Sequence, residues 1–284
     1  MPNDFNQHVI DEFRANRGRL SGPFEGGRLL LLTTTGARSG AAHTTPVGFL
    51  PDGGERVLVI ASAGGAPRHP AWFHNLVADP RVTVEDGVFT YEARAEVLTG
   101  AERDAAFARA VERDPGWAEY QAKTSRVLPV VALRAIGNGP PNVTGATSWG
   151  DALKVVHDGF RRELGLIRKE IAESGPSGPG LGAQLRVNCL TLCKGLHNHH
   201  SGEEAGLFPF IGSRHPQLAA ALELMREEHE RIAALLGTLQ KTVSADAVDP
   251  RAVLPEVERL TDELEKHLLH EEEQLIPILD AAAP

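Results

Sequence analysis

Two matching strings of residues constrain this chain more than any other feature. The first runs from His199 to Pro209 and the second from His267 to Pro277. In each, a Glu follows the leading His after four residues, and an apolar pair and a Pro close the string. Positions i and i+4 lie on one face of a helix, so each string presents an imidazole and a carboxylate side by side. Two such helices facing each other predict a pocket of nitrogen and oxygen ligands that suits iron, manganese or zinc.

Length, charge and cysteine content narrow the class of protein. The chain has 284 residues, enough for two domains, and a net charge of −9 that argues against a nucleic-acid partner. We expect no integral membrane segment, because the longest apolar run is only Leu29–Leu32, and no signal peptide at the N-terminus. The two cysteines, Cys189 and Cys193, cannot form a disulfide framework. These features predict a cytoplasmic protein.

Residues 1–136 are predicted to form a mixed α and β domain. A short amphipathic helix is expected over 5–19, with further helices over 72–78 and 100–113. Short runs rich in β-branched residues, separated by Gly, Pro and Asp, predict strands over 29–35, 43–50, 56–62, 82–84, 88–98 and 127–134. Several short antiparallel strands with few helices favour a barrel over a sheet of βαβ units.

Residues 137–147 are predicted to form a linker, and residues 148–284 a helical domain. The linker is rich in Gly, Pro and Asn. Four helices are expected beyond it: one ending near Ser174, a second from Leu181 through the first His/Glu string, a third from His215 to about Thr242, and a fourth from Pro250 to about Asp280. The fold class is therefore α+β, a barrel followed by an up-down four-helix bundle.

Every predicted helix of the bundle supplies a histidine. The candidate ligands are His157 on the first helix, His199, His200, Glu203 and Glu204 on the second, His229 on the third, and His267 and Glu271 on the fourth. The alternative is that these residues are solvated on helix surfaces. A surface role does not require matched spacing on two helices, so we favour a two-metal site.

The helical half resembles the hemerythrin-like, or HHE cation-binding, domain family over about residues 149–282. The resemblance rests on the two His/Glu strings. It implies two non-haem irons, with manganese or zinc as alternatives, and a role in binding or sensing oxygen, peroxide or nitric oxide. One departure is Met225, where oxygen-carrying members have a second His on the third helix. His200 or Glu204 would then substitute as a ligand.

Two segments of the first half have the composition of a cofactor site. Thr33–Gly40 is a hydroxyl-rich, Gly-punctuated turn that carries Arg38, a suitable cradle for an anion. Ser62–Leu76 combines a glycine pair with a polar and aromatic helix start. Glycines allow close approach of a flat ligand to the backbone, and a helix N-terminus favours anions.

These segments, with Asp79-Pro80 and Pro115–Tyr120, resemble the deazaflavin-dependent nitroreductase family over about residues 5–135. The resemblance implies a split β-barrel, coenzyme F420, hydride transfer to a quinone, nitroaromatic or enone, and relatives that often form homodimers. It implies a set of cofactor-binding residues: Arg38, Ser39, Gly40, His43, Thr45, Pro46, Ser62, Gly64, Gly65, Trp72 and Asn75. Trp117 and Tyr120 would face the substrate. The catalytic residues remain unassigned.

Two readings of function stay open. In the first, a deazaflavin-dependent reductase is fused to a di-iron bundle that handles a small oxidant. In the second, the protein is a metal-dependent sensor or iron-handling protein whose barrel no longer catalyses a reaction. The second is supported by His43 and Ala63, which stand where some relatives carry Arg and Lys. Fluorescence of added coenzyme would distinguish the two readings.

Overall fold

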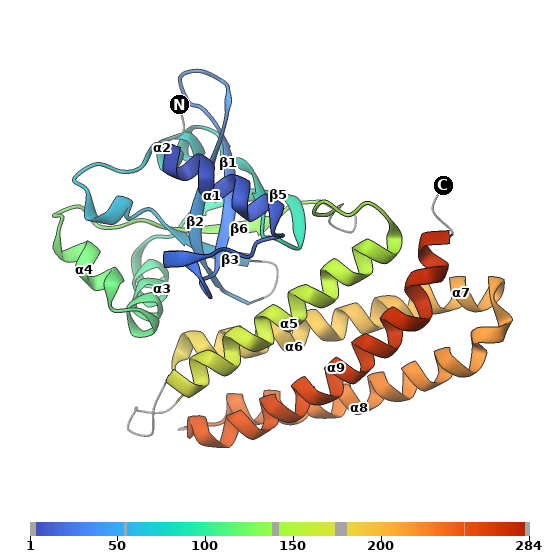
Figure 1. Ribbon diagram of the computed structural model, residues 1–284. Coiled ribbons are helices and arrows are strands. Elements are labelled where there is room, and N and C mark those ends of the chain that lie inside the picture. Colours follow the sequence, from blue (N-terminus) through green and yellow to red (C-terminus); the bar gives the residue numbers. More distant parts are fainter. Residues whose placement is uncertain (1–3, 54–55, 138–141, 174–180, 247, 282–284) are drawn as a thin grey trace. The chain divides into compact units, whose positions relative to one another are not determined.

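The computed structural model describes residues 4–53, 56–137, 142–173, 181–246 and 248–281. The chain divides into two compact units, Met1–Gly145 and Ala146–Pro284, which Figure 1 shows as a strand-rich part and a set of long helices. Each unit is described by itself. None of the described helices is both long and apolar enough to cross a bilayer.

The first unit is built on an antiparallel β-barrel. Its six main strands are β1 (Leu29–Thr35), β2 (Ala42–Pro51), β3 (Arg56–Ile60), β4 (Arg81–Glu85), β5 (Phe89–Val97) and β6 (Val130–Ala135). They are hydrogen-bonded in the order β4-β1-β2-β3-β6-β5, and a further pairing of β4 with β5 closes the ring. This confirms the predicted split β-barrel.

Strand β1 shows why the barrel needs a covering helix. Side chains alternate along a strand, so Leu30 and Leu32 point into the barrel core while Leu31 points outward. Helix α1 (Asp4–Ala15) covers Leu31 with Ile10 and Phe13, and all three side chains are buried. The apolar run Leu29–Leu32 is therefore a strand buried on both faces.

The remaining elements of the first unit are short. They are the 3-10 turns η1 (Gly22–Phe24) and η2 (Ala63–Gly65), the helices α2 (Ala71–Ala78), α3 (Gly100–Arg113) and α4 (Gly116–Ala122), and strand β7 (Asn142–Val143). Strand β7 pairs with β5, so residues 142–143, inside the segment predicted to be a linker, extend the sheet of the barrel. Residues 138–141 of that segment lie outside the described residues.

The second unit is an up-down four-helix bundle, as predicted. Its long helices are α5 (Trp149–Glu173), α6 (Ala183–Gly202), α8 (Ala219–Ser244) and α9 (Pro250–Ala281). Helix α5 packs between α6 and α9, and α8 packs against the same two helices. Helix α6 continues through a π-helical turn, η3 (Glu203–Leu207), into α7 (Phe208–Arg214), and the 3-10 turn η4 (Pro216–Leu218) leads into α8. The predicted break at 174–180 lies outside the described residues.

Two apolar clusters fill the bundle, with a polar layer between them. The larger cluster includes Leu164 on α5 and Leu196 on α6, and the smaller includes Leu153 on α5 and Phe208 on α7. On α5, and on α6 with its continuation into α7, the candidate ligands lie between these positions. The fold thus encloses polar side chains in an apolar core, where they need partners.

Candidate metal centre and barrel cleft

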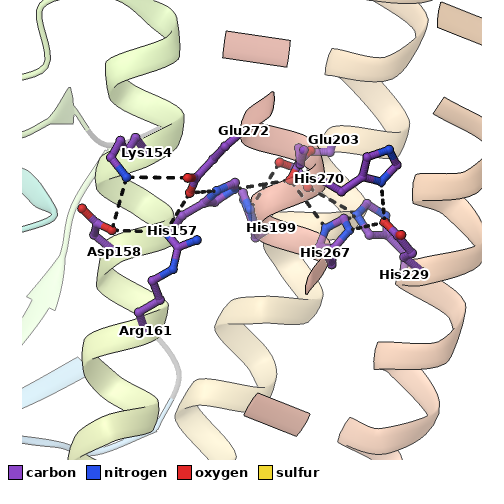
Figure 2. A network of polar contacts seen from close by, with 12 residues as sticks. Lys154, His157, Asp158, Arg161, His199, Glu203, His229, His267, His270 and Glu272 are labelled. Atoms are coloured by element: carbon purple, nitrogen blue, oxygen red, sulfur yellow. Dashed lines mark hydrogen bonds and ion pairs between the residues drawn. The ribbon is translucent and has the colours of Figure 1, made fainter. Parts of the chain in front are cut away.

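The polar layer of the bundle holds seven histidine and glutamate side chains from five helical segments. Helix α5 supplies His157, α6 supplies His199 and His200, η3 begins with Glu203, α8 supplies His229, and α9 supplies His267 and Glu271. Figure 2 labels five of them: His157, His199, Glu203, His229 and His267. His157, His267 and Glu271 are 0% exposed, and the others except His199 are at most 5% exposed. The His199 side chain is 13% exposed.

The ligand atoms gather into two groups. His157, His199, Glu203 and Glu271 form the first, and His200, His229 and His267 form the second. Within each group the ligand atoms lie within 4.8 Å of one another, about twice a metal–ligand bond. We call these position one and position two.

Both glutamates reach from one position to the other. Glu203 Oε1 lies 3.2 Å from His199 Nε2 in position one, and its Oε2 lies 3.7 Å from His229 Nε2 in position two. Glu271 Oε2 lies 3.3 Å from His157 Nε2 and 3.5 Å from His267 Nε2. A carboxylate so placed can bridge two cations.

The π turn at Glu203 makes the two matched strings unequal in space. On α9, Glu271 is followed after four residues by the buried Leu275. On the first string, the fully buried residue is Phe208, five residues after Glu203, while Leu207 is only partly buried. A π turn adds one residue to a helical turn and is frequent at functional sites. Here it keeps both Glu203 and Phe208 directed inward.

A carboxylate outside the layer faces each of three histidines. The Nδ1 atom of His157 lies 2.9 Å from Glu272, that of His229 lies 2.8 Å from Glu204, and that of His267 lies 3.0 Å from Glu228. An imidazole that donates its Nδ1 proton to a carboxylate keeps a lone pair on Nε2. The three Nε2 atoms are thus prepared as ligands.

The inward-facing atoms fit a cation. Among the described residues, the Nε2 atoms of His157, His199 and His200 and all four carboxylate oxygens of Glu203 and Glu271 are buried without a hydrogen-bond partner. Buried polar atoms are costly unless they are satisfied. Divalent cations bound by these atoms would satisfy them and offset the two carboxylate charges.

Burial and mutual repulsion set the ionisation of this layer when no metal is present. Burial, reinforced by His157, lowers the pKa of His199 to about 3, and burial lowers the pKa of His200 further. Burial and the neighbouring charge of Glu271 raise the pKa of Glu203 well above its usual range. For Glu271, burial acts to raise the pKa, but the neighbouring imidazoles of His157, His267 and His199 together outweigh it and lower the pKa. His199 and His200 are thus neutral and ready to bind a metal.

The structure distinguishes the two residues predicted as substitute ligands, His200 and Glu204. His200 lies in position two with two other histidines. Glu204 is outside both groups, because its side chain is 44% exposed and faces the Nδ1 atom of His229. Met225 is fully buried in the smaller apolar cluster. Glu228 and Glu272 were not predicted as site residues, since no spacing rule marks a carboxylate that acts behind a histidine.

The barrel carries a cleft of about 860 Å³ beside the Thr33–Gly40 turn. Six of the predicted cofactor residues line it: Arg38, Ser39, His43, Thr45, Trp72 and Asn75. Helix α1 forms another part of the wall through Asn6, Gln7, Ile10 and Arg14. Arg38 is exposed and has no ion-pair partner among the described residues, so it can receive an anion.

Asn75 fastens this turn to helix α2. Its side-chain oxygen accepts a hydrogen bond from the Ala37 amide at 3.0 Å, and its nitrogen donates to Thr34 Oγ1 at 3.0 Å. At Gly36, a Cβ atom would lie 2.5 Å from Ser39 Oγ and 2.8 Å from the His43 ring. A side chain at position 36 would therefore have to displace Ser39 and His43. Asn75 shapes the cleft as well as lining it.

The other predicted cofactor and substrate residues do not line this cleft. Ser62, Gly64 and Gly65 lie at η2, while Trp117 and Tyr120 lie on α4, which packs against η2. A Cβ atom on Gly65 would lie 2.7 Å from the Tyr120 carbonyl oxygen, so that glycine allows α4 to approach the loop. At Gly64 nothing lies within 4 Å of such an atom. Gly40 and Pro46 also lie outside the residues that line the cleft.

Arg126, which was not predicted as a site residue, holds the η2 loop in place. Its guanidinium donates hydrogen bonds to the carbonyl oxygens of Ala66 at 2.8 Å, of Ala61 at 2.9 Å and of Ser62. The loop contains Ala63, Gly64 and Gly65 in succession at positive φ, of 47°, 64° and 82°. Backbone in this region is strained for Ala63, so the loop needs such an anchor.

Comparison with known proteins agrees with both halves. The F420H(2)-dependent quinone reductase family matches residues 6–135, and the hemerythrin HHE cation binding domain matches residues 150–279. An F420H(2)-dependent quinone reductase of Mycobacterium tuberculosis is 34% identical over 125 residues, which cover 43% of this chain and 83% of that protein.

Two solved structures are also similar to the first half. A structure of an F420-H2 dependent reductase is 40% identical and covers 38% of this chain and 94% of its own, with a TM-score of 0.35. A second, described as a domain-swapped dimer, is 34% identical and covers 47% of this chain and 100% of its own, with a TM-score of 0.37.

The fold and the matches define a split-barrel reductase domain joined to a helical cation-binding domain. The chain belongs to the F420H(2)-dependent quinone reductase family and carries a hemerythrin HHE domain after its barrel. Both predicted resemblances are confirmed.

Proposed function

We propose that this protein is an F420H(2)-dependent reductase of quinones whose bundle holds two iron ions. The observation that supports the metal centre best is the set of seven buried nitrogen and oxygen atoms without a hydrogen-bond partner among the described residues. A core would not retain so many unsatisfied atoms at a cost of about 1–3 kcal/mol each unless a ligand compensated them.

Position one would hold its metal through His157, His199, Glu203 and Glu271, and position two through His200, His229 and His267. Glu203 and Glu271 would each contribute to both positions, as their distances to histidines of the two groups allow. In this assignment His200 replaces the histidine that Met225 displaces from α8. Glu204, Glu228 and Glu272 would orient the rings of His229, His267 and His157.

Iron bound here would supply a site for dioxygen, peroxide or nitric oxide. The residues around the iron would control its access to bulk water. The two apolar clusters exclude bulk water from the layer on both sides along the bundle axis. Manganese or zinc would bind to the same donors, so metal identity has to be measured.

In the barrel, the reduced deazaflavin would supply the hydride, and the protein would bind and orient it. Arg38, Ser39 and His43 would receive its anionic groups, and Trp72 would offer an aromatic wall. Trp72 is buried at 6% exposure, which gives it a defined orientation. Quinones, nitroaromatics and activated enones are the substrate classes to test, with Trp117 and Tyr120 as candidate contacts.

The central experiment measures metal content and reductase activity on the same preparation. Protein purified without chelator should contain two equivalents of iron, and it should oxidise reduced F420 when a soluble menaquinone analogue is added. Less than about a tenth of an equivalent of any transition metal after reconstitution would refute the metal centre. Unchanged coenzyme fluorescence on titration would refute the reductase and favour a barrel that has lost catalysis.

A further inference from the structure

The two metal positions differ in the chemistry of their donors. Position one combines two imidazoles with the two carboxylates Glu203 and Glu271, whereas position two gathers three imidazoles. Carboxylate oxygens suit manganese and other hard cations, and imidazole nitrogens suit zinc, copper, iron and nickel. The glutamates approach position two less closely, at 3.5 and 3.7 Å from its histidines, than position one, at 3.2 and 3.3 Å.

The carboxylates behind the histidines strengthen this difference. Glu272, behind His157 of position one, is paired with Arg161 at 2.7 Å and with Lys154 at 3.6 Å (Figure 2). Glu228, behind His267 of position two, has its nearest arginine contact at 4.0 Å, to Arg231. A carboxylate that accepts a proton from a ligand imidazole raises its basicity, and pairing with cations weakens that effect.

His229 of position two has a similar environment. Its partner, Glu204, is half-exposed, and no Arg or Lys pairs with it among the ion pairs of the described residues. Both histidines of position two that have carboxylate partners are therefore backed by carboxylates without a close Arg or Lys, and Glu228 Oε2 is shared with His270 Nδ1 at 3.2 Å. Position two presents the stronger nitrogen donors, and position one presents the harder oxygen donors.

We propose that the centre discriminates between metals when several are available, with position two taking an imidazole-preferring divalent ion such as zinc first, and position one taking manganese. This inference rests on the proposed two-metal function and adds an order of loading and a selectivity to it. The chain would then assemble a mixed-metal pair when both kinds of ion are available.

The test uses the full chain, freed of metal with a chelator and titrated with zinc and then with manganese. Zinc should bind in two steps whose dissociation constants differ by roughly tenfold or more. After one equivalent of zinc, one equivalent of manganese should bind and give the electron paramagnetic resonance signal of an isolated ion. X-ray absorption of the protein with one equivalent of zinc should show three imidazole ligands.

Matched variants assign the steps. His200→Ala should remove the tighter zinc step and leave manganese binding, and His199→Ala should weaken the manganese step and leave the tighter zinc step. His197→Ala, an exposed histidine on the same helix, should change neither step. Helical content by circular dichroism identifies any variant that does not fold, and the X-ray absorption measurement on the wild type remains decisive in that case.

The outcomes separate the inference from the function on which it rests. Two metals that bind with equal affinity, or a first zinc ion with fewer than three imidazole ligands, would overturn the selectivity and leave a two-metal centre. A chain that binds neither zinc, manganese nor iron would overturn the proposed metal centre itself.

Discussion

The Nε2 atoms of His229 and His267 face each other at 3.1 Å. Both rings also place Nδ1 against a carboxylate, at 2.8 Å from Glu204 and 3.0 Å from Glu228. If each Nδ1 donates its proton outward, two lone pairs meet in the core, and that contact is repulsive unless a cation lies beside it. The contact between these two rings therefore lowers the stability of the bundle when no metal is bound.

Metal binding should stabilise the bundle strongly. A metal that binds only the folded chain adds about 2.7 kcal/mol at a free concentration one hundred times its dissociation constant. Urea unfolding followed by far-ultraviolet circular dichroism should show this gain when iron or zinc is added to chelated protein. His229→Leu should be more stable than wild type without metal and should gain much less from metal. An equal gain in both proteins would contradict the role given to this pair.

Without metal, stability should fall in acid because of His199. Its pKa is about 3 in the folded chain, against an ordinary value of 6.5. Between these values the unfolded chain binds a proton that the folded chain does not, so the free energy of unfolding decreases as pH falls from about 6.5. Glu203 has the opposite effect on stability. Its pKa is raised in the folded chain, so the free energy of unfolding decreases as pH rises through that raised pKa. In chelated protein, His199→Leu should flatten the acid side of the curve of stability against pH, and Glu203→Gln the alkaline side.

Loss of Glu203 or Glu271 should lower metal affinity by more than the roughly 10- to 100-fold that the loss of a group behind a ligand costs. Glu203→Gln should fold well, since the amide resembles the protonated carboxyl that its raised pKa favours without metal. Glu271→Gln should bind metal equally poorly. Glu223→Gln is the control, because that side chain is 67% exposed and makes a surface ion pair with Arg226. Equal iron content in the three variants after reconstitution would contradict the ligand assignment.

Helical periodicity was sufficient to predict much of the metal layer. The spacing of His199 from Glu203 and of His267 from Glu271 places each pair on one face, and the structure gathers them. The choice between His200 and Glu204 could not be predicted, because it depends on the π turn that starts at Glu203. Such a turn shifts the inward face by one residue and leaves no clear mark in the sequence.

Strand patterning likewise predicted the barrel, while the glycines of its loop were ambiguous. A glycine can admit a ligand or another part of the chain, and sequence does not distinguish the two. At Gly65 the neighbour is the backbone of α4, and at Gly36 it is the side chains of Ser39 and His43. Contacts between residues distant in sequence, such as Arg126 with Ala61, emerge only from the folded chain.

Arg126→Lys should destabilise the barrel by about 1–3 kcal/mol, because one ammonium cannot reach all the carbonyl oxygens that the guanidinium binds. Denaturant unfolding followed by tryptophan fluorescence reports this change, since Trp72 and Trp117 belong to the barrel. Arg19→Lys, at an exposed position, serves as the control. A loss of coenzyme affinity should accompany the loss of stability if the η2 loop contacts the deazaflavin. Unchanged stability would show that the anchor is dispensable.

Arg38→Ala should weaken coenzyme binding about fivefold at low salt. Arg38 is exposed at the cleft and has no ion-pair partner among the described residues, so its charge is available to an anionic ligand. An exposed contact of this kind contributes about 1 kcal/mol, which corresponds to that factor. Because salt screens exposed charges, the difference between wild type and variant should shrink at high ionic strength. Titration of the full chain with F420, followed by fluorescence, measures both effects.

Arg68→Ala, an exposed arginine that does not line the cleft, is the matched control. Identical binding by wild type and Arg38→Ala at low salt would show that the Thr33–Gly40 turn does not receive the anionic part of the coenzyme.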